Sequence, residues 1–438
     1  MPSALALDLF RGVMNDEQIK REKRRRRRIR NQVFAYLTLV VLIVAALVGL
    51  CFGVNGVVRY VKNYNNKVNE FIAEAESSMA AELENESASV PESTQTAYDE
   101  KEYTAEPSED PLGELVTTLL QDMTLEEMVS GMFLVTPEAL TGVQTVVKAG
   151  ESTQNALIEK PVGGLIYSAK NFRSKEQFEE MLQNTKGFSK YPLFFAVTAE
   201  CGEGSSFGIE RTKKASEITK TDDASEAYGA IAQTLASYGI NMNMAPVSEI
   251  AADDDRNLAG RTFGSDAALA APLVNAAVQV LQENGVSAVL QKFPGTGTET
   301  KTLEELKNSE FIIYETVIKN DVDCIMVSNV NSQGVTGDDT PSSLSSAMIT
   351  QVLRESLGFD GVVITDALDD EAITKNYTPE EAAVAAIEAG ADVLYRPSDL
   401  EAAYNGVLKA VQDGRITKER ICESVYRIYK VKYKNMVL

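Results

Sequence analysis

The stretch PSSLSSAMITQVLRESLGFDGVVITDAL, residues 341–368, is the most informative part of this chain for the fold. Ser346–Leu357 has the apolar spacing of an amphipathic helix, and the β-branched run Val362–Thr365 is typical of a buried strand. Asp366 follows that strand directly. A helix that leads into a buried strand is one unit of an alternating α/β architecture, which favours a parallel sheet.

The same alternation extends in both directions from this stretch. Thr124–Glu127 is a capping box that opens a helix, and further helices are expected at Ala224–Ser237, Ala267–Asn284 and Pro379–Ala389. The other six strands are expected at Gly164–Tyr167, Leu193–Val197, Asn241–Ala245, Ala288–Leu290, Cys324–Ser328 and Val393–Tyr395. Seven strands that alternate with helices predict an α/β fold, a (β/α)8 TIM-type barrel over residues 112–438. A doubly wound open sheet is the competing architecture, although no G-x-G-x-x-G follows a strand.

Composition excludes several kinds of chemistry. The 438 residues contain no His and no Trp, so a Ser-His-Asp triad, an imidazole acid and a His-ligated zinc site are all excluded. Four Cys without a C-x-x-C spacing do not form a disulfide scaffold. No cofactor or metal is expected. The net charge of −22 argues against nucleic acid as a partner, because phosphate binding needs a basic face.

The N-terminal third is organised differently from the rest. Residues 1–32 are basic, with 10 Lys/Arg against 4 Asp/Glu, and residues 33–54 (VFAYLTLVVLIVAALVGLCFGV) are apolar and uncharged. A run of this length predicts a single transmembrane helix, and the basic flank predicts a cytoplasmic N-terminus. Nucleic-acid or nuclear targeting is the alternative interpretation of the basic run. Residues 55–111 carry 13 acids against 4 bases and read as a helix followed by a disordered acidic linker.

Strand ends hold the candidate site, because chemistry on a TIM-type barrel sits where its strands end. Asp366 is placed for nucleophilic attack or ligand binding, and its alternative role is to cap the next helix; position alone divides these two interpretations evenly. Lys292 follows the expected strand Ala288–Leu290, and Arg261 lies on the insertion after the strand that ends near Pro246.

Seven ordered motifs in residues 112–438 resemble glycoside hydrolase family 3. Within that family, they resemble the catalytic barrel of the single-domain β-N-acetylhexosaminidases. The motifs are MTLEEMVSGMFLV around Thr124, GGLIYSAKNF from Gly163, YGINMNMAPVSEI from Tyr238, GRTFGSD from Gly260, KFPGTG from Lys292, the stretch 341–368, and AIEAGADVLYRP from Ala386.

The resemblance implies hydrolysis of β-linked N-acetylglucosaminyl sugars with retention, through a covalent glycosyl-enzyme, and no cofactor. The family's nucleophile falls on Asp366, and its hydroxyl-binding Arg falls on Arg261. Its substrate-binding Lys-His pair reads here as Gln291-Lys292, which leaves Lys292 as a candidate substrate-binding residue, and its second His reads as Thr296.

Other catalytic positions of the family are not retained. The sugar-binding Asp and Arg of its D-Q-E-G-G-R motif read as Thr198 and Glu203, and the acid/base His has no counterpart. Retaining hydrolysis needs a proton donor for the leaving oxygen. Glu299 and Glu203 are candidate replacement acids, for which solvated surface charge is the simpler interpretation.

Two functional hypotheses follow from these residues. The favoured one is a membrane-anchored, extracytoplasmic pseudoenzyme that is impaired in hydrolysis and binds a glycan, such as a peptidoglycan fragment, or an envelope protein partner. The alternative is an active retaining β-N-acetylhexosaminidase with a replacement acid/base. Turnover that depends on Asp366 distinguishes the two.

Overall fold

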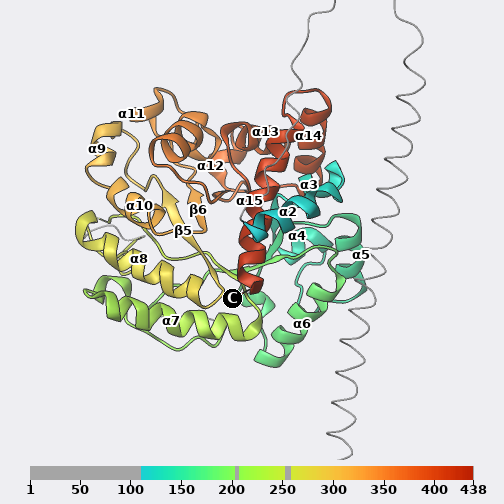
Figure 1. Cartoon of the computed structure of the whole chain (residues 1–438), viewed down its shortest axis with the longest axis horizontal. Coiled ribbons are helices and arrows are strands. Elements are labelled where there is room, and N and C mark those ends of the chain that lie inside the picture. Colours follow the sequence, from blue (N-terminus) through green and yellow to red (C-terminus); the bar gives the residue numbers. More distant parts are fainter. Residues whose placement is uncertain (1–109, 203–206, 252–257, 438) are drawn as a thin grey trace, which may run out of the picture. The chain divides into compact units, whose positions relative to one another are not determined.

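The computed structural model describes residues 110–202, 207–251 and 258–437 (Figure 1). The predicted cytoplasmic segment 1–32, the transmembrane helix 33–54 and nearly all of the linker 55–111 lie outside the described residues. Among the residues that are described, no helix has both the length and the apolar character needed to cross a membrane.

The described body is built on one sheet of parallel strands in the order β7-β6-β5-β4-β3-β2-β1-β8. The strands are β1 (Phe133–Val135), β2 (Gly164–Ile166), β3 (Phe194–Val197), β4 (Met242–Asn243), β5 (Ser287–Phe293), β6 (Cys324–Val327), β7 (Val362–Thr365) and β8 (Leu394–Tyr395). The two outer strands also meet, because Ile364 bridges Val393 in parallel and the Thr365 N–H donates to the Val393 carbonyl at 3.0 Å. The sheet therefore closes into a parallel α/β barrel of the TIM type, and the doubly wound alternative is wrong.

One strand was missed by the sequence prediction. Strand β1 is only three residues long. The helix that Thr124 caps ends at Ser130, and β1 begins three residues later, at Phe133. Its residues continue the apolar run of that helix, so periodicity does not separate the two. Strand β5 is longer than predicted and runs through Lys292, with a register shift between Leu290 and Phe293.

Helices surround the barrel and connect its strands (Figure 1). They are α2 (Pro111–Gln121), α3 (Leu125–Ser130), α4 (Pro137–Thr141), α5 (Glu151–Glu159), η1 (Ala169–Asn171), α6 (Lys175–Phe188), η2 (Ala215–Glu217), α7 (Thr221–Tyr238), α8 (Ala267–Glu283), α9 (Leu303–Lys307), α10 (Phe311–Ile318), α11 (Gln333–Thr336), η3 (Ser342–Leu344), η4 (Ala347–Ser356), α12 (Glu371–Thr374), α13 (Pro379–Ala389), α14 (Leu400–Gln412) and α15 (Lys418–Val437).

The C-terminal helix α15 packs against the amino ends of several strands. Ser424 on α15 donates to the fully buried Asp392 at 2.6 Å, just before β8. Lys434 pairs with Asp323 at 2.8 Å before β6, and Asn435 donates to Ser287 at 2.8 Å in β5. Helix α15 therefore holds the amino-terminal end of the barrel together, which leaves the carboxyl end for a site.

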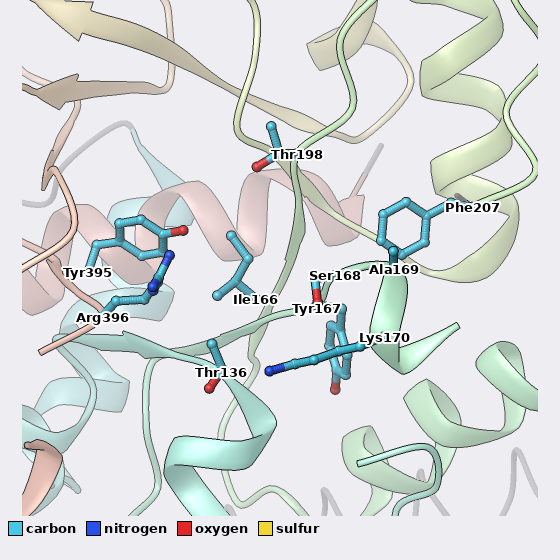
Figure 2. A pocket seen from close by; sticks show the side chains of 10 residues that line it. All are labelled: Thr136, Ile166, Tyr167, Ser168, Ala169, Lys170, Thr198, Phe207, Tyr395 and Arg396. Carbon is cyan, nitrogen blue, oxygen red and sulfur yellow. The ribbon is translucent and has the colours of Figure 1, made fainter. Parts of the chain in front are cut away.

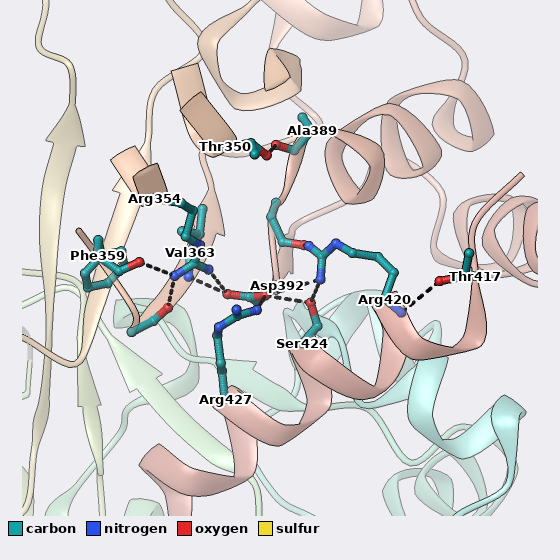
Figure 3. Close-up of polar contacts among 12 residues, drawn as sticks. Thr350, Arg354, Phe359, Val363, Ala389, Asp392, Thr417, Arg420, Ser424 and Arg427 are labelled. Atoms are coloured by element: carbon teal, nitrogen blue, oxygen red, sulfur yellow. Dashed lines mark hydrogen bonds and ion pairs between the residues drawn. The ribbon is translucent and has the colours of Figure 1, made fainter. Parts of the chain in front are cut away.

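Asp392 has three arginine partners at this end of the barrel (Figure 3). Arg354 on η4 pairs with its Oδ2, and Arg427 and Arg420 on α15 approach its Oδ1 at 3.4 and 3.7 Å. Burial lowers the pKa of Arg354 below its ordinary value and outweighs the attraction of Asp392, which acts to raise it. A single carboxylate thus joins η4, β8 and α15.

Candidate active site

The carboxyl ends of the strands form the barrel mouth, and Asp366 lies there directly after β7. Its backbone N–H donates to the Val327 carbonyl of β6 at 2.8 Å, which places it over the closed sheet. Lys292 in β5 donates from Nζ to Asp366 Oδ2 at 2.7 Å, and Asp366 Oδ1 accepts from the Ala367 N–H at 2.9 Å. Both carboxylate oxygens of the nucleophile position therefore have a partner, and two of the predicted site residues are in contact.

The helix-cap interpretation of Asp366 is wrong. Helix α12 is capped by Asp370, whose side chain accepts from the Ala372 N–H at 2.9 Å. The turn that carries Asp366 is instead held by Asn329, which donates to the Ala367 carbonyl at 2.8 Å. Asp366 is therefore left to face the mouth, partly buried and paired with Lys292.

Arg261 is positioned by Glu200, at the end of the turn after β3. Its Nε donates to Glu200 Oε2 at 2.7 Å and its Nη2 to Oε1 at 2.6 Å, a bidentate pair. These hydrogen bonds raise the pKa of Arg261 above its ordinary value. The Glu200 turn is fixed in turn by Asn243, whose side chain bonds both the N–H and the carbonyl of Ala199 at 2.9 Å.

The positions that replace the family's Lys-His pair and second His have different roles. Gln291 is buried and donates to the Met244 carbonyl at 2.7 Å, so it joins β4 to β5 and does not face a ligand. Thr296 is exposed, and its N–H donates to the buried Glu249 at 2.7 Å. Only Lys292 of the predicted pair reaches Asp366.

The structure describes one of the two candidate replacement acids. Glu203 lies outside the described residues. The Glu299 carbonyl accepts from the N–H of Gly334 on α11 at 2.9 Å, but the Glu299 carboxylate makes no hydrogen bond or ion pair with the part of the chain that is described. Tyr395 at the end of β8 is a third acidic group near Asp366, yet burial raises its pKa above 10, which makes it a weaker proton donor.

A pocket of about 460 Å³ opens in the barrel mouth on the side of β8, β1, β2 and β3 (Figure 2). We call it the mouth pocket. The described residues that line it are Thr136, Ile166, Tyr167, Ser168, Ala169, Lys170, Thr198, Phe207, Tyr395 and Arg396. Thr198 occupies the position of the family's sugar-binding Asp, so this pocket is where the resemblance would place a sugar.

Two cations of the mouth pocket were not among the predicted site residues. Lys170 lies three residues beyond the predicted strand Gly164–Tyr167, and it pairs with Glu138 at 3.3 Å. Arg396 directly follows β8 and pairs with Asp369 at 2.6 Å. Their places after strand ends were a signal that sequence reasoning could have used. In the described part of the chain, no group of three or more Cys, Asp or Glu is arranged to hold a metal ion.

Comparison with known proteins places this geometry in a family. The model of the "Glycosyl hydrolase family 3 N terminal domain" matches residues 124–431. A "Beta-hexosaminidase" of Hydrogenovibrio crunogenus is 26% identical over 269 residues, which is 56% of this chain and 75% of the relative. The "Beta-hexosaminidase LpqI" of Mycobacterium bovis is 30% identical over 220 residues, covering 46% of this chain and 56% of the relative.

A solved structure agrees with the sequence comparisons. The glycoside hydrolase family 3 β-N-acetylglucosaminidase of Paenibacillus sp. str. FPU-7 is 29% identical, with a TM-score of 0.66. The match covers 72% of this chain and 63% of that one, so the chain spans less than two thirds of that enzyme.

Proposed function

The chain belongs to glycosyl hydrolase family 3, and we propose that it is a membrane-anchored, extracytoplasmic protein that binds amino-sugar glycans and is impaired in their hydrolysis. Its β-hexosaminidase relatives support the glycan class. Peptidoglycan fragments are the substrates or ligands that fit an extracytoplasmic barrel, and an envelope protein is the second kind of partner.

The observation that carries this proposal is that no proton donor for the leaving group is found beside Asp366 in the described residues. The carboxylate is paired with Lys292, and the chain contains no His to protonate a leaving group. General acid/base catalysis contributes about 10²–10⁴-fold to such reactions. A barrel that keeps the nucleophile position without an acid is therefore expected to bind its glycan with no turnover above background.

Active hydrolysis is the second candidate function, and one observation favours it. Asp366 and Arg261 keep the family's residue types, and Asp366 stays at the barrel mouth instead of capping a helix. In this case an acidic group in the mouth supplies the proton that leaves with the aglycone, while Asp366 forms the glycosyl-enzyme.

One experiment separates the two. The full chain in a mild detergent is incubated with a chromogenic aryl β-N-acetylglucosaminide, with Asp366→Asn as control, and binding of N-acetylglucosamine oligosaccharides is measured by calorimetry. We expect binding with turnover no higher than that of the control. Turnover that the substitution abolishes would overturn the pseudoenzyme proposal and establish the hydrolase.

The membrane anchor is proposed from residues 33–54 and the basic residues before them. Deletion of residues 1–54 is expected to move the protein from the membrane fraction to the soluble fraction. A deletion variant that stays with the membrane, or full-length protein that a protease digests only from the cytoplasmic side, contradicts the anchor or its orientation.

A further inference from the structure

The described side chains that line the mouth pocket include positively charged hydrogen-bond donors but no negatively charged acceptor. Lys170 and Arg396 are the only described lining residues that are ionised at neutral pH, and both are cations. None of the described lining side chains is a carboxylate or a carboxamide. Ammonium and guanidinium groups donate hydrogen bonds and never accept them.

The two cations are held in place and remain accessible. Lys170 is 49% exposed and Arg396 is 41% exposed, whereas their partners Glu138 and Asp369 are more buried, at 11% and 33%. Glu138 is itself tied down by the Val146 N–H at 2.9 Å. Figure 2 shows Lys170 and Arg396 on either side of Thr136, at the same end of the pocket.

The backbone at Arg396 is an independent sign that its position matters. Its φ angle is +48°, in the left-handed region that residues with a side chain rarely adopt. Strain of this kind persists where the surrounding structure demands it, which is frequent at ligand sites. With this backbone conformation, Arg396 lines the mouth pocket directly after β8.

The acceptors that the described side chains of the pocket offer to a neutral sugar are uncharged hydroxyls, such as those of Ser168 and Thr198. Hydroxyl groups both donate and accept, so a site for them needs acceptors as well as donors. The Thr136 hydroxyl already accepts from the Ala139 N–H at 3.1 Å, and the residue at the family's sugar-binding Asp position is the neutral Thr198. A group with acceptors only, such as a carboxylate or a phosphate ester, fits the donors that remain.

We propose that the mouth pocket binds an anionic glycan, whose carboxylate or phosphate ester lies between Lys170 and Arg396 while the sugar ring fills the rest of the pocket, where Tyr395 and Phe207 lie on opposite sides (Figure 2). This inference rests on the proposed function and deepens it, because it names the class of glycan. In the family, an Asp of the protein recognises sugar hydroxyl groups. Here the acidic group is on the sugar, and the cations Lys170 and Arg396 of the protein recognise it.

Matched sugars test the proposal. Binding of N-acetylglucosamine, N-acetylmuramic acid and N-acetylglucosamine 6-phosphate to the full chain is measured by calorimetry at low and high salt. We expect at least one acidic sugar to bind about tenfold more tightly than the neutral one, as a hydrogen-bonded charge contributes in partly buried sites. That preference should shrink at high salt. N-acetylmuramic acid carries a lactyl carboxylate and N-acetylglucosamine 6-phosphate a phosphate ester, so comparing the two shows which acid the pocket binds.

Variants locate the effect in the pocket. Lys170→Gln and Arg396→Gln are each expected to remove most of the preference for the acidic sugar, because they weaken binding of the acidic sugar more than binding of the neutral one. Lys409→Gln is the matched control, since Lys409 lies on α14 and is 73% exposed. Circular dichroism shows whether Arg396→Gln folds; Lys170→Gln, at an exposed ammonium, carries the test if it does not.

The outcomes separate this inference from the proposed function. Equal affinity for neutral and acidic sugars, unchanged in the Lys170 and Arg396 variants, overturns the anionic class and leaves glycan binding in place. A preference for acids that survives both substitutions overturns the pocket as its source. Binding of none of the sugars overturns both proposals.

Discussion

Replacing Lys432 with methionine tests how the buried end of the barrel responds to pH. Lys432 lies on α15 and is only 1% exposed. Its Nζ sits 4.3 Å from the ring centre of Tyr429 and 5.0 Å from that of Phe194, and it has no hydrogen-bond partner in the described residues. Burial lowers the pKa of Lys432 from 10.5 to about 7.

The direction of the pH effect follows from where the proton is held. The unfolded chain keeps the Lys432 proton up to about pH 10.5, whereas the native protein releases it near pH 7. Between these values unfolding takes up a proton, so the free energy of unfolding rises with pH across the window. Each tenfold change in proton affinity corresponds to about 1.4 kcal/mol. Lys432 therefore destabilises the native state by about 5 kcal/mol well below pH 7, by about 2 kcal/mol at pH 9, and by almost nothing above pH 10.5.

Lys432→Met keeps an unbranched side chain, one atom shorter, and removes its charge. We expect the variant to be more stable than the parent by about 4 kcal/mol at pH 7, with the gain shrinking to under about 1 kcal/mol at pH 10.5. Urea unfolding followed by circular dichroism measures it, because the chain has no Trp for fluorescence. Lys409→Met is the control, since its exposed ion pair with Asp413 contributes little at any pH.

The result that refutes this reasoning is specific. A Lys432→Met variant that is no more stable than the parent at pH 7 means that the native protein does not bury an uncompensated ammonium. A gain of equal size at pH 7 and pH 10.5 means that the effect is one of packing and not of protonation.

Two further predictions concern the folding of the barrel. Asp392→Asn leaves Arg354 buried without its carboxylate, and we expect a loss of about 3–5 kcal/mol, seen as a lower thermal midpoint by circular dichroism; an unchanged midpoint contradicts the role of this cluster. Gly163→Ala places a methyl carbon 2.0 Å from the backbone oxygen of Gly131, so this variant should fail to fold, whereas Gly187→Ala, which meets open space on α6, should gain up to about 1 kcal/mol.

The sequence was sufficient for the architecture because local signals recur along the whole chain. The capping box at Thr124 forms as predicted, and helix α13 has the predicted bounds Pro379–Ala389. Strand β7 also has its predicted bounds, Val362–Thr365. Strand β1 was missed because three buried residues after an apolar helix have no period of their own. Closure of the barrel was an inference from strand number, and the β7–β8 contact confirms it.

The candidate site was predictable in its residues and not in its contacts. Asp366 was found because it follows a recognisable strand, but its pairing with Lys292 joins positions 74 residues apart. The mouth pocket is a stronger case. Lys170 follows β2 and Arg396 follows β8, and the two approach one pocket only because β8 lies beside β1 in the closed sheet. No local sequence pattern predicts that Lys170 and Arg396 lie near each other.

The two ends of the barrel use the same kind of ion pair for different purposes. At the amino end the carboxylate of Asp392 is fully buried, so loss of one partner leaves a charge without solvent and destabilises the fold. At the mouth the cations Lys170 and Arg396 are nearly half exposed, and such pairs contribute under about 1 kcal/mol. A ligand anion can therefore share these cations with Glu138 and Asp369 without loosening the barrel. It follows that substitutions at the mouth report on binding, while substitutions around α15 report on stability, and the two sets of experiments can be interpreted independently.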